Sequence, residues 1–146
     1  MTVNQVEQEL MSYISDHKIW NTQSHHLPER AMQDFNLDKL ISHTYLQWQQ
    51  ITPGTTAESR SAYLEKVRYK SYFVWLQKAI GELYGISEPI TAKNWDQISE
   101  EIRKAHQNPS FYMDVLKNKC KYQNIIVDTY WNPGSDNGRP ELFTPA

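Results

Sequence analysis

The feature that most limits the fold of this chain is a pair of short strand-like segments with helical sequence between them. The first runs from Lys18 to Thr22, and the second is the β-branched run Ile125-Ile126-Val127. A wholly apolar run such as Ile125-Ile126-Val127 is typical of a strand buried on both faces of a parallel sheet. Two strands alone are only marginally stable, so we expect them to belong to a larger β/α protein.

Several stretches between and around the strands have apolar residues at the three- and four-residue spacing of an amphipathic helix. Thr2 and Gln5 form a capping-box pair at the start of the chain. Gly85 stands where a helix ends in a left-handed cap. The predicted helices cover residues 2–17, a segment capped by Asn36 that carries Leu37, Leu40, Ile41, Tyr45 and Trp48, about 57–84, about 92–106, and Asn108 to Cys120.

The composition indicates an ordinary globular protein, with 39% hydrophobic and 22% charged residues. A formal net charge of -2 gives no electrostatic reason to expect nucleic acid or an anionic membrane as the main partner. The single cysteine, Cys120, excludes an intrachain disulfide and fits a reducing compartment. No basic, apolar leader opens the chain, and no apolar run approaches the ~20 residues of a membrane span. We therefore expect a cytoplasmic protein.

The polar residues after the first strand come closest to reactive chemistry. Such residues at the carboxyl end of a barrel strand form metal or substrate sites. Adjacent residues of an extended segment point to opposite sides, so only one of His25 and His26 can face a shared site. His25 fits a metal ligand that coordinates through a neutral ring nitrogen. The alternative is a polar loop histidine that hydrogen-bonds to the backbone.

The run Asn21-Thr22-Gln23-Ser24-His25-His26-Leu27-Pro28 resembles the first-strand motif of the amidohydrolase superfamily, Asp-Thr-His-x-His followed by an apolar residue. The resemblance is closest to the uronate isomerase-like branch, where a helical insertion also separates the first two barrel strands. His43-Thr44-Tyr45-Leu46-Gln47-Trp48 is similar to that branch's His-Tyr-x-Trp stretch, with one extra residue. Further residues of this chain are similar in order and spacing to the helical insertion and second strand of that branch. They are Trp75, Leu83-Tyr84-Gly85-Ile86, Trp95 and Ile125-Ile126-Val127-Asp128-Thr129.

The resemblance implies the N-terminal part of a (β/α)8 TIM-type barrel, an incomplete domain because a full barrel needs ~250 residues. Residues 1–35 would hold the leading helix, the first strand and the site loop, residues 36–121 the helical insertion, and residues 122–146 the second strand and tail. The resemblance also implies a divalent ion, most often zinc, with His25 as a ligand. Gln23 replaces the other histidine of the motif and Asn21 replaces its acid; an amide oxygen binds zinc less well than imidazole. Tyr45 matches a tyrosine expected to bind the substrate.

Two hypotheses for the function follow. The first is a metal-dependent hydrolase or uronate isomerase-like enzyme acting on a small polar substrate, such as a sugar acid, an amide or an ester. Its metal ion would act as a Lewis acid or lower the pKa of bound water. The second is a catalytically silent homologue or a helical interaction module that binds no metal, which the replacement at Gln23 favours. Either protein can form a homo-oligomer, and catalytic residues stay unassigned.

The remaining candidates have structural interpretations that the sequence favours. Asp128 can transfer a proton or bind substrate, but a turn-capping role is favoured. The ring of Tyr45 is expected to pack in the helical core. Basic and aromatic residues alternate between Arg68 and Lys78, a pattern that can bind single-stranded nucleic acid. These aromatics follow the helical period, so core packing is predicted for them as well.

Overall fold

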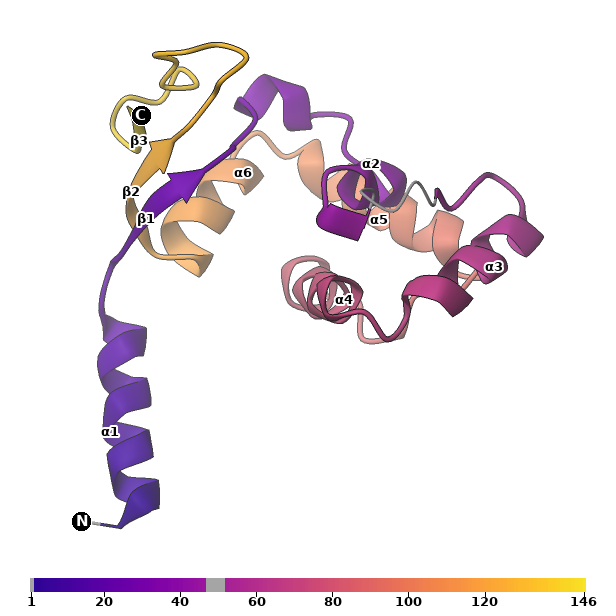
Figure 1. The fold of residues 1–146 in the computed structure, drawn as a ribbon, viewed down its shortest axis with the longest axis horizontal. Helices are drawn as coiled ribbons and strands as arrows, with labels where there is room; N and C mark the ends of the chain where they lie inside the picture. Colours follow the sequence, from indigo (N-terminus) through magenta and orange to yellow (C-terminus); the bar gives the residue numbers. More distant parts are fainter. Residues whose placement is uncertain (1, 47–51) are drawn as a thin grey trace. The chain divides into compact units, whose positions relative to one another are not determined.

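The computed structural model describes residues 2–46 and 52–146 of the chain (Figure 1). They form two compact units, residues 1–29 with 112–146 and residues 30–111. We call the first the sheet unit, because the strands lie in it, and the second the helical unit. Trp48, expected on the apolar side of a helix, lies outside the described residues. No helix in the described ranges is long and apolar enough to cross a membrane.

The sheet unit is built on three parallel strands in the order β1-β2-β3 (Figure 1). They are β1 (Ile19–Ser24), β2 (Tyr122–Val127) and β3 (Phe143–Pro145). The two strands expected from the sequence are therefore present and pair directly, with Ser24 opposite Val127. The buried side chains of this unit come mainly from β2 and its surroundings: Tyr112, Leu116, Ile125, Val127, Leu142 and Phe143.

The third strand was not expected from the sequence, because β3 is only three residues long and ends in a proline. Phe143 lies opposite Ile125, and the amide of Ala146 donates to the carbonyl oxygen of Val127 at 3.0 Å. Proline is tolerated here because β3 is an edge strand. Residues 128–142, which join β2 to β3, contain turns and no helix.

The N-terminal helix α1 (Val3–Asp16) forms as the sequence predicts, but its apolar stripe is not buried. The Thr2 hydroxyl accepts from the Gln5 amide, and the Gln5 side chain accepts from the Thr2 amide, which completes the capping box. No residue of α1 is buried, and Leu10 is 56% exposed. The spacing of apolar residues therefore predicted the helix correctly without predicting a packing partner.

The helical unit contains α2 (Leu37–Ser42), α3 (Ala57–Val67), α4 (Ser71–Tyr84) and α5 (Trp95–His106), preceded by the short 3-10 helix η1 (Glu29–Met32). Asn36 caps α2 as predicted, its side chain accepting from the Lys39 amide at 2.9 Å. After this unit, α6 (Phe111–Asp114) leads into a π-helical turn, η3 (Val115–Lys119). The core of the helical unit is one apolar cluster: Leu37, Ile41, Leu46, Tyr63, Val67, Phe73, Ile80, Ile90, Trp95, Ile98 and Ile102.

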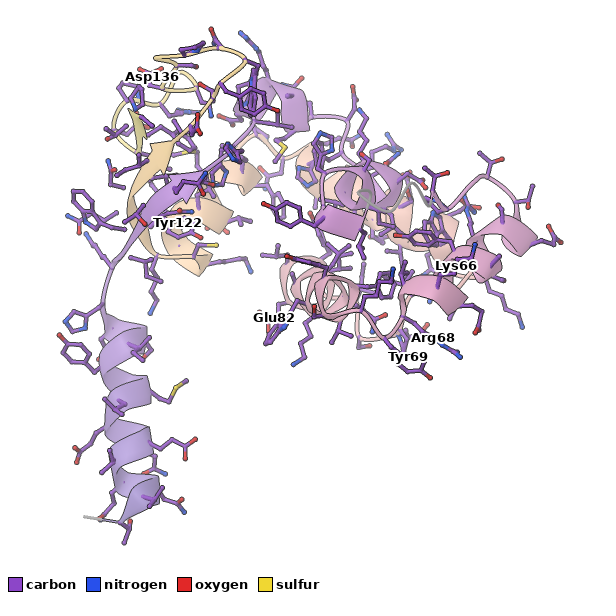
Figure 2. All side chains as sticks on the ribbon, in the orientation of Figure 1. Lys66, Arg68, Tyr69, Glu82, Tyr122 and Asp136 are labelled. Atoms are coloured by element: carbon purple, nitrogen blue, oxygen red, sulfur yellow. The ribbon has the colours of Figure 1, made fainter. Side chains whose placement is uncertain are left out.

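The single long helix expected over residues 57–84 is two helices, α3 and α4, separated at residues 68–70. At roughly 100° per residue, a continuous helix would turn Phe73 and Ile80 about a third of a turn away from Tyr63 and Val67. The break lets both pairs reach the same core. Figure 2 shows Arg68 and Tyr69 projecting outward where the first helix gives way to the second.

The prediction that the chain forms part of a TIM-type barrel is wrong. The described residues form a small α/β protein with six α-helices and an open three-stranded sheet. In a barrel, each strand is followed by a helix that packs back against the closed sheet. Here α2 to α5 bury their apolar faces in a core of their own, and turns follow β2. The helical unit spans residues 30–111, compared with the insertion expected over residues 36–121.

Candidate functional site

His25 lies where the carboxyl ends of β1 and β2 meet, and we call this place the strand edge. It directly follows the last residue of β1, and Asp128 directly follows the last residue of β2. The Asp128 amide donates to the carbonyl oxygen of Ser24 at 2.8 Å, which joins the two strand ends. The His25 Nδ1 atom lies 2.7 Å from the carbonyl oxygen of Asp128. The parallel pairing of β1 and β2 therefore positions the imidazole at a shared strand edge.

Both nitrogens of the His25 ring have a hydrogen-bonding partner, and the partners fix the tautomer. A carbonyl oxygen can only accept, so Nδ1 carries the proton that it donates to Asp128. The Nε2 atom of His25 then keeps its lone pair and lies 3.2 Å from Nε2 of Gln23, whose amide donates to it. The Nε2 atom of His25 is thus held beside the Gln23 side chain, while Nδ1 is held by the Asp128 carbonyl.

Two aromatic side chains form a wall beside His25. Its ring lies 6.1 Å from Tyr130 and 6.2 Å from Trp131, and the last two rings contact each other edge to face at 4.7 Å. The buried Thr129 precedes them, and its hydroxyl donates to the Asn132 carbonyl at 2.6 Å, which fixes the turn. Tyr130 and Trp131 were not among the predicted site residues, although their place three and four residues after the end of β2 is a signal that indicates them.

His26 contacts a different part of the sheet unit, as expected for adjacent residues of an extended segment. Its ring lies 5.5 Å from Phe143 of β3. Burial lowers the pKa of His26, because charging the ring there would remove a cation from water. The His26 carbonyl accepts from the Asn137 side chain at 2.9 Å. His26 is therefore a packing residue next to the site.

The loop after the two histidines is held against the C-terminal turns by polar contacts. Arg139 Nε donates to Glu29 at 3.1 Å, and this carboxylate raises the pKa of the arginine further. The Tyr112 hydroxyl donates to the Leu27 carbonyl at 3.0 Å. Burial and the nearby Glu29 carboxylate together raise the pKa of Tyr112. These contacts fix the segment that carries His25 and His26.

The residues at this edge do not fit a divalent metal ion. Within the described ranges, no group of three or more His, Cys, Asp or Glu side chains could hold one. The donors present are one imidazole and one neutral amide, whereas catalytic zinc sites take three protein ligands. Asp128 reaches His25 through its backbone carbonyl. The edge thus supplies too few ligands for a zinc site by itself, while the assignment of His25 as one metal ligand stays a prediction.

Tyr45, the predicted substrate-binding residue, belongs to the helical unit and not to the unit that contains His25. Its side chain is 49% exposed, and its ring lies 5.2 Å from that of Tyr72. The half-exposed ring is not part of the buried helical core. His43, from the same motif, places Nδ1 2.8 Å from the Lys39 carbonyl at the end of α2.

Comparison with known proteins adds nothing to this geometry: no model of a protein family matches the chain, and no curated protein matches it. The resemblance to the amidohydrolase motif therefore depends on the residues themselves. Among the residues that carry the resemblance, residues 21–24 belong to β1 and residues 25–28 follow its carboxyl end.

Proposed function

We propose that the strand edge around His25 binds a small polar molecule and does so without a divalent ion. This is the metal-free form of the amidohydrolase-type hypothesis. Its main support is the pair of hydrogen bonds on the His25 ring, from Nδ1 to Asp128 and from Gln23 to Nε2. They leave an acceptor nitrogen of His25 and the Gln23 side-chain amide next to each other, and a ligand can replace their mutual hydrogen bond with bonds of its own.

The chemistry of the edge favours a sugar acid among the small polar ligands. The Gln23 side-chain amide can donate to a carboxylate or a hydroxyl, and the His25 Nε2 atom can accept from a sugar hydroxyl. Tyr130 and Trp131, which are 75% and 48% exposed, offer flat apolar surfaces to the carbon face of a sugar ring. Orientation by a few polar groups beside an aromatic wall is the usual arrangement of a small-molecule site.

Histidine NMR of the whole chain, titrated with glucuronate, tests this proposal. We expect the His25 ring signals to shift on saturation, and His25→Ala to weaken glucuronate binding about tenfold or more. His17→Ala is the matched control, because that exposed histidine caps the end of α1, eight residues before His25, and it should leave the affinity unchanged. Glucuronate binding that survives His25→Ala, or no shift of the His25 signals at saturating glucuronate, would contradict the proposal.

A metal-dependent hydrolase or isomerase is the second candidate function, supported by the orientation of His25. Metal-binding histidines donate their other ring N–H to a carbonyl or carboxylate, as His25 does to Asp128. Zinc titration by calorimetry distinguishes the two candidates. The metal-free proposal expects no stoichiometric zinc binding by the chain and none by Gln23→His. Tight zinc binding restored by Gln23→His would favour the metal-dependent candidate instead.

A further inference from the structure

The exposed apolar face of α1 has the residue spacing of a coiled-coil interface. Val3, Val6, Leu10 and Tyr13 follow one another at intervals of three, four and three residues. In the seven-residue repeat of coiled coils, with positions a to g, this is the spacing of positions a and d, which contact a partner helix. All four side chains are exposed, from 40% at Val6 to 82% at Val3. We call these four residues the α1 seam.

The charged side chains of α1 all lie beside this seam. Glu7 occupies an e position, and Glu9 and Asp16 occupy g positions. Ile14, at the other e position, widens the apolar face. The outward positions b, c and f hold no charged residue: Asn4, Gln5, Gln8, Met11, Ser12 and Ser15. A helix that only faces water has no physical reason to keep its charges next to its apolar stripe, whereas e and g charges of coiled coils form ion pairs with the partner helix.

The helix is stabilised at both ends by contacts within the sheet unit. The capping box at Thr2 and Gln5 satisfies amides of the first turn, and the Lys121 side chain donates to the Ser15 carbonyl in the last turn. Isolated helices of this length are marginal in water. Because α1 is already formed, a partner that binds its seam does not have to pay for ordering it.

The sign of the flanking charges selects among the possible occupants of the seam. No ion pair joins Glu7, Glu9 or Asp16 to another of the described residues. Residues 1–17 contain no lysine or arginine, so two copies of α1 would bring only acidic or uncharged flanks together. Helices that lie on anionic membranes carry lysine and arginine on their polar face, which α1 lacks. A partner with basic flanks is the complementary case.

We propose that the α1 seam binds an amphipathic helix of another protein, one that carries lysine or arginine on both sides of its own apolar stripe. Leu10 and Tyr13 pack between the apolar side chains of the partner, and their removal from water supplies most of the affinity. Glu7 and Glu9 pair with the partner's cations and fix which helix binds and in which register.

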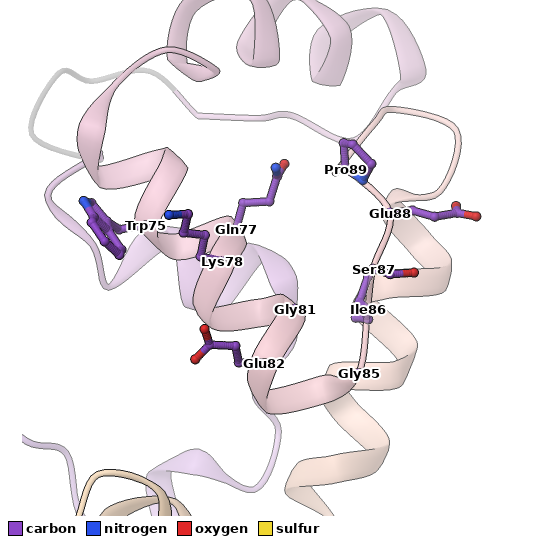
Figure 3. A pocket seen from close by; sticks show the side chains of 10 residues that line it. All are labelled: Trp75, Gln77, Lys78, Gly81, Glu82, Gly85, Ile86, Ser87, Glu88 and Pro89. Atoms are coloured by element: carbon purple, nitrogen blue, oxygen red, sulfur yellow. The ribbon is translucent and has the colours of Figure 1, made fainter. Parts of the chain in front are cut away.

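The exposed aromatic face of α4 lacks this arrangement of charges. Figure 3 shows Trp75, Lys78 and Glu82 along one flank of α4 and the segment 86–89 along the other, beside a groove of about 660 Å³. A cation and an anion share the flank of Trp75, so its surroundings select no sign of charge. Trp75, which is 66% exposed, therefore provides a control for the loss of an exposed apolar side chain elsewhere.

Fluorescence anisotropy with the full chain tests the proposal. The probe is a fluorescein-labelled helical peptide with valine and leucine at positions a and d and lysine at e and g, and the control peptide has glutamate in place of every lysine. We expect the lysine peptide to bind and the glutamate peptide not to bind. Leu10→Ala should weaken binding of the lysine peptide about tenfold, whereas Trp75→Ala should leave it unchanged.

Reversal of the flanking charges gives a result that loss of structure could not produce. Glu7→Lys combined with Glu9→Lys should transfer binding from the lysine peptide to the glutamate peptide. Gln8→Lys combined with Ser12→Lys is the matched control, because it adds two cations to the outward side of the same helix, and it should keep the preference for the lysine peptide. Circular dichroism of each variant checks that the helices persist.

Four outcomes would overturn the proposal. They are equal binding of the two peptides, unchanged binding after Leu10→Ala, a preference for the lysine peptide that survives the charge reversal, and no binding of either peptide. Sedimentation and vesicle binding test the other occupants. A dimer of the chain that Leu10→Ala dissociates would identify a second copy as the occupant, and tighter binding to phosphatidylglycerol vesicles than to the lysine peptide would identify a membrane; each would also overturn it.

Discussion

The two units of the molecule treat their apolar residues in opposite ways. The helical unit gathers eleven buried apolar side chains into one cluster, with Trp95 fully buried among them. The sheet unit buries a smaller set around β2 and leaves whole elements uncovered: Leu10 of α1 is 56% exposed and Trp20 of β1 is 59% exposed. Parallel sheets are usually covered on both faces. An amphipathic pattern thus predicts a helix or strand. The apolar face of that element becomes part of a core only where another apolar surface packs against it.

Removal of the largest buried side chain of the helical unit should have the largest effect on stability. Trp95 packs edge to face on Tyr63, and its indole N–H donates to Asp38 at 3.3 Å. Trp95→Ala should lower the free energy of unfolding by about 3–5 kcal/mol. Trp20→Ala in β1 should change it by less than about 0.5 kcal/mol, because that indole is already hydrated. Equal shifts of the urea midpoint in the two variants would refute the contrast between the units.

Two buried tyrosines sharpen the comparison, because they differ in hydrogen bonding. Among residues 2–46 and 52–146, none hydrogen-bonds to the buried Tyr63 hydroxyl in the helical unit, whereas the Tyr112 hydroxyl in the sheet unit donates to the Leu27 carbonyl. Burial raises the pKa of Tyr63 to about 12. Tyr63→Phe should stabilise the protein by about 1 kcal/mol, and Tyr112→Phe should destabilise it by about 1 kcal/mol. Chemical denaturation of both variants measures this; shifts of the same sign would contradict it.

Each unit also contains a histidine whose pKa is lowered by burial, His26 in the sheet unit and His106 in the helical unit. In the unfolded chain, both rings take up protons near their ordinary pKa of 6.5. The folded protein takes them up only at lower pH, so the unfolded state binds more protons below that value. Stability from both rings should therefore be complete above the ordinary pKa and decrease as the pH falls through it.

The smallest of the expected effects is this pH dependence, and NMR titration of both rings together with urea midpoints at about pH 7.5 and about pH 5.5 measures it. His106 has a specific partner, since its Nε2 atom lies 2.9 Å from the Tyr84 hydroxyl oxygen. His26→Gln should reduce the slope of stability against pH. A midpoint that rises on acidification would show that the buried rings do not control the dependence.

The sequence predicted those helices and strands that depend on a few residues close together in the chain. The capping pair at Thr2 and Gln5, the cap at Asn36 and the β-branched run of β2 each depend on a few neighbouring residues. β3 could not be found in this way, because three residues that end in Pro145 form a strand only through their pairing with β2. The break at residues 68–70 likewise depends on the core that both helices share.

The candidate site was partly predictable for the same reason. The strand end at His25 is visible in the sequence, and its tautomer follows once Asp128 is known to lie beside it. The contribution of Tyr130 and Trp131 requires the pairing of two strands far apart in the chain. The helical period suggested that Tyr72 and Trp75 are buried, but both side chains are exposed. Their burial would require another element to pack against that face of α4, which the period alone does not predict.

The connection between β2 and β3 consists of turns, so a single cut within it would divide the chain between these two strands. A protease that cuts near Gly134, where the backbone is exposed and adopts φ 80°, would leave β3 attached by noncovalent contacts alone. The released fragment would carry both Arg139, which pairs with Glu29, and Phe143, which lies against His26. A single cut far from His25 along the chain could thus loosen the segment that holds it.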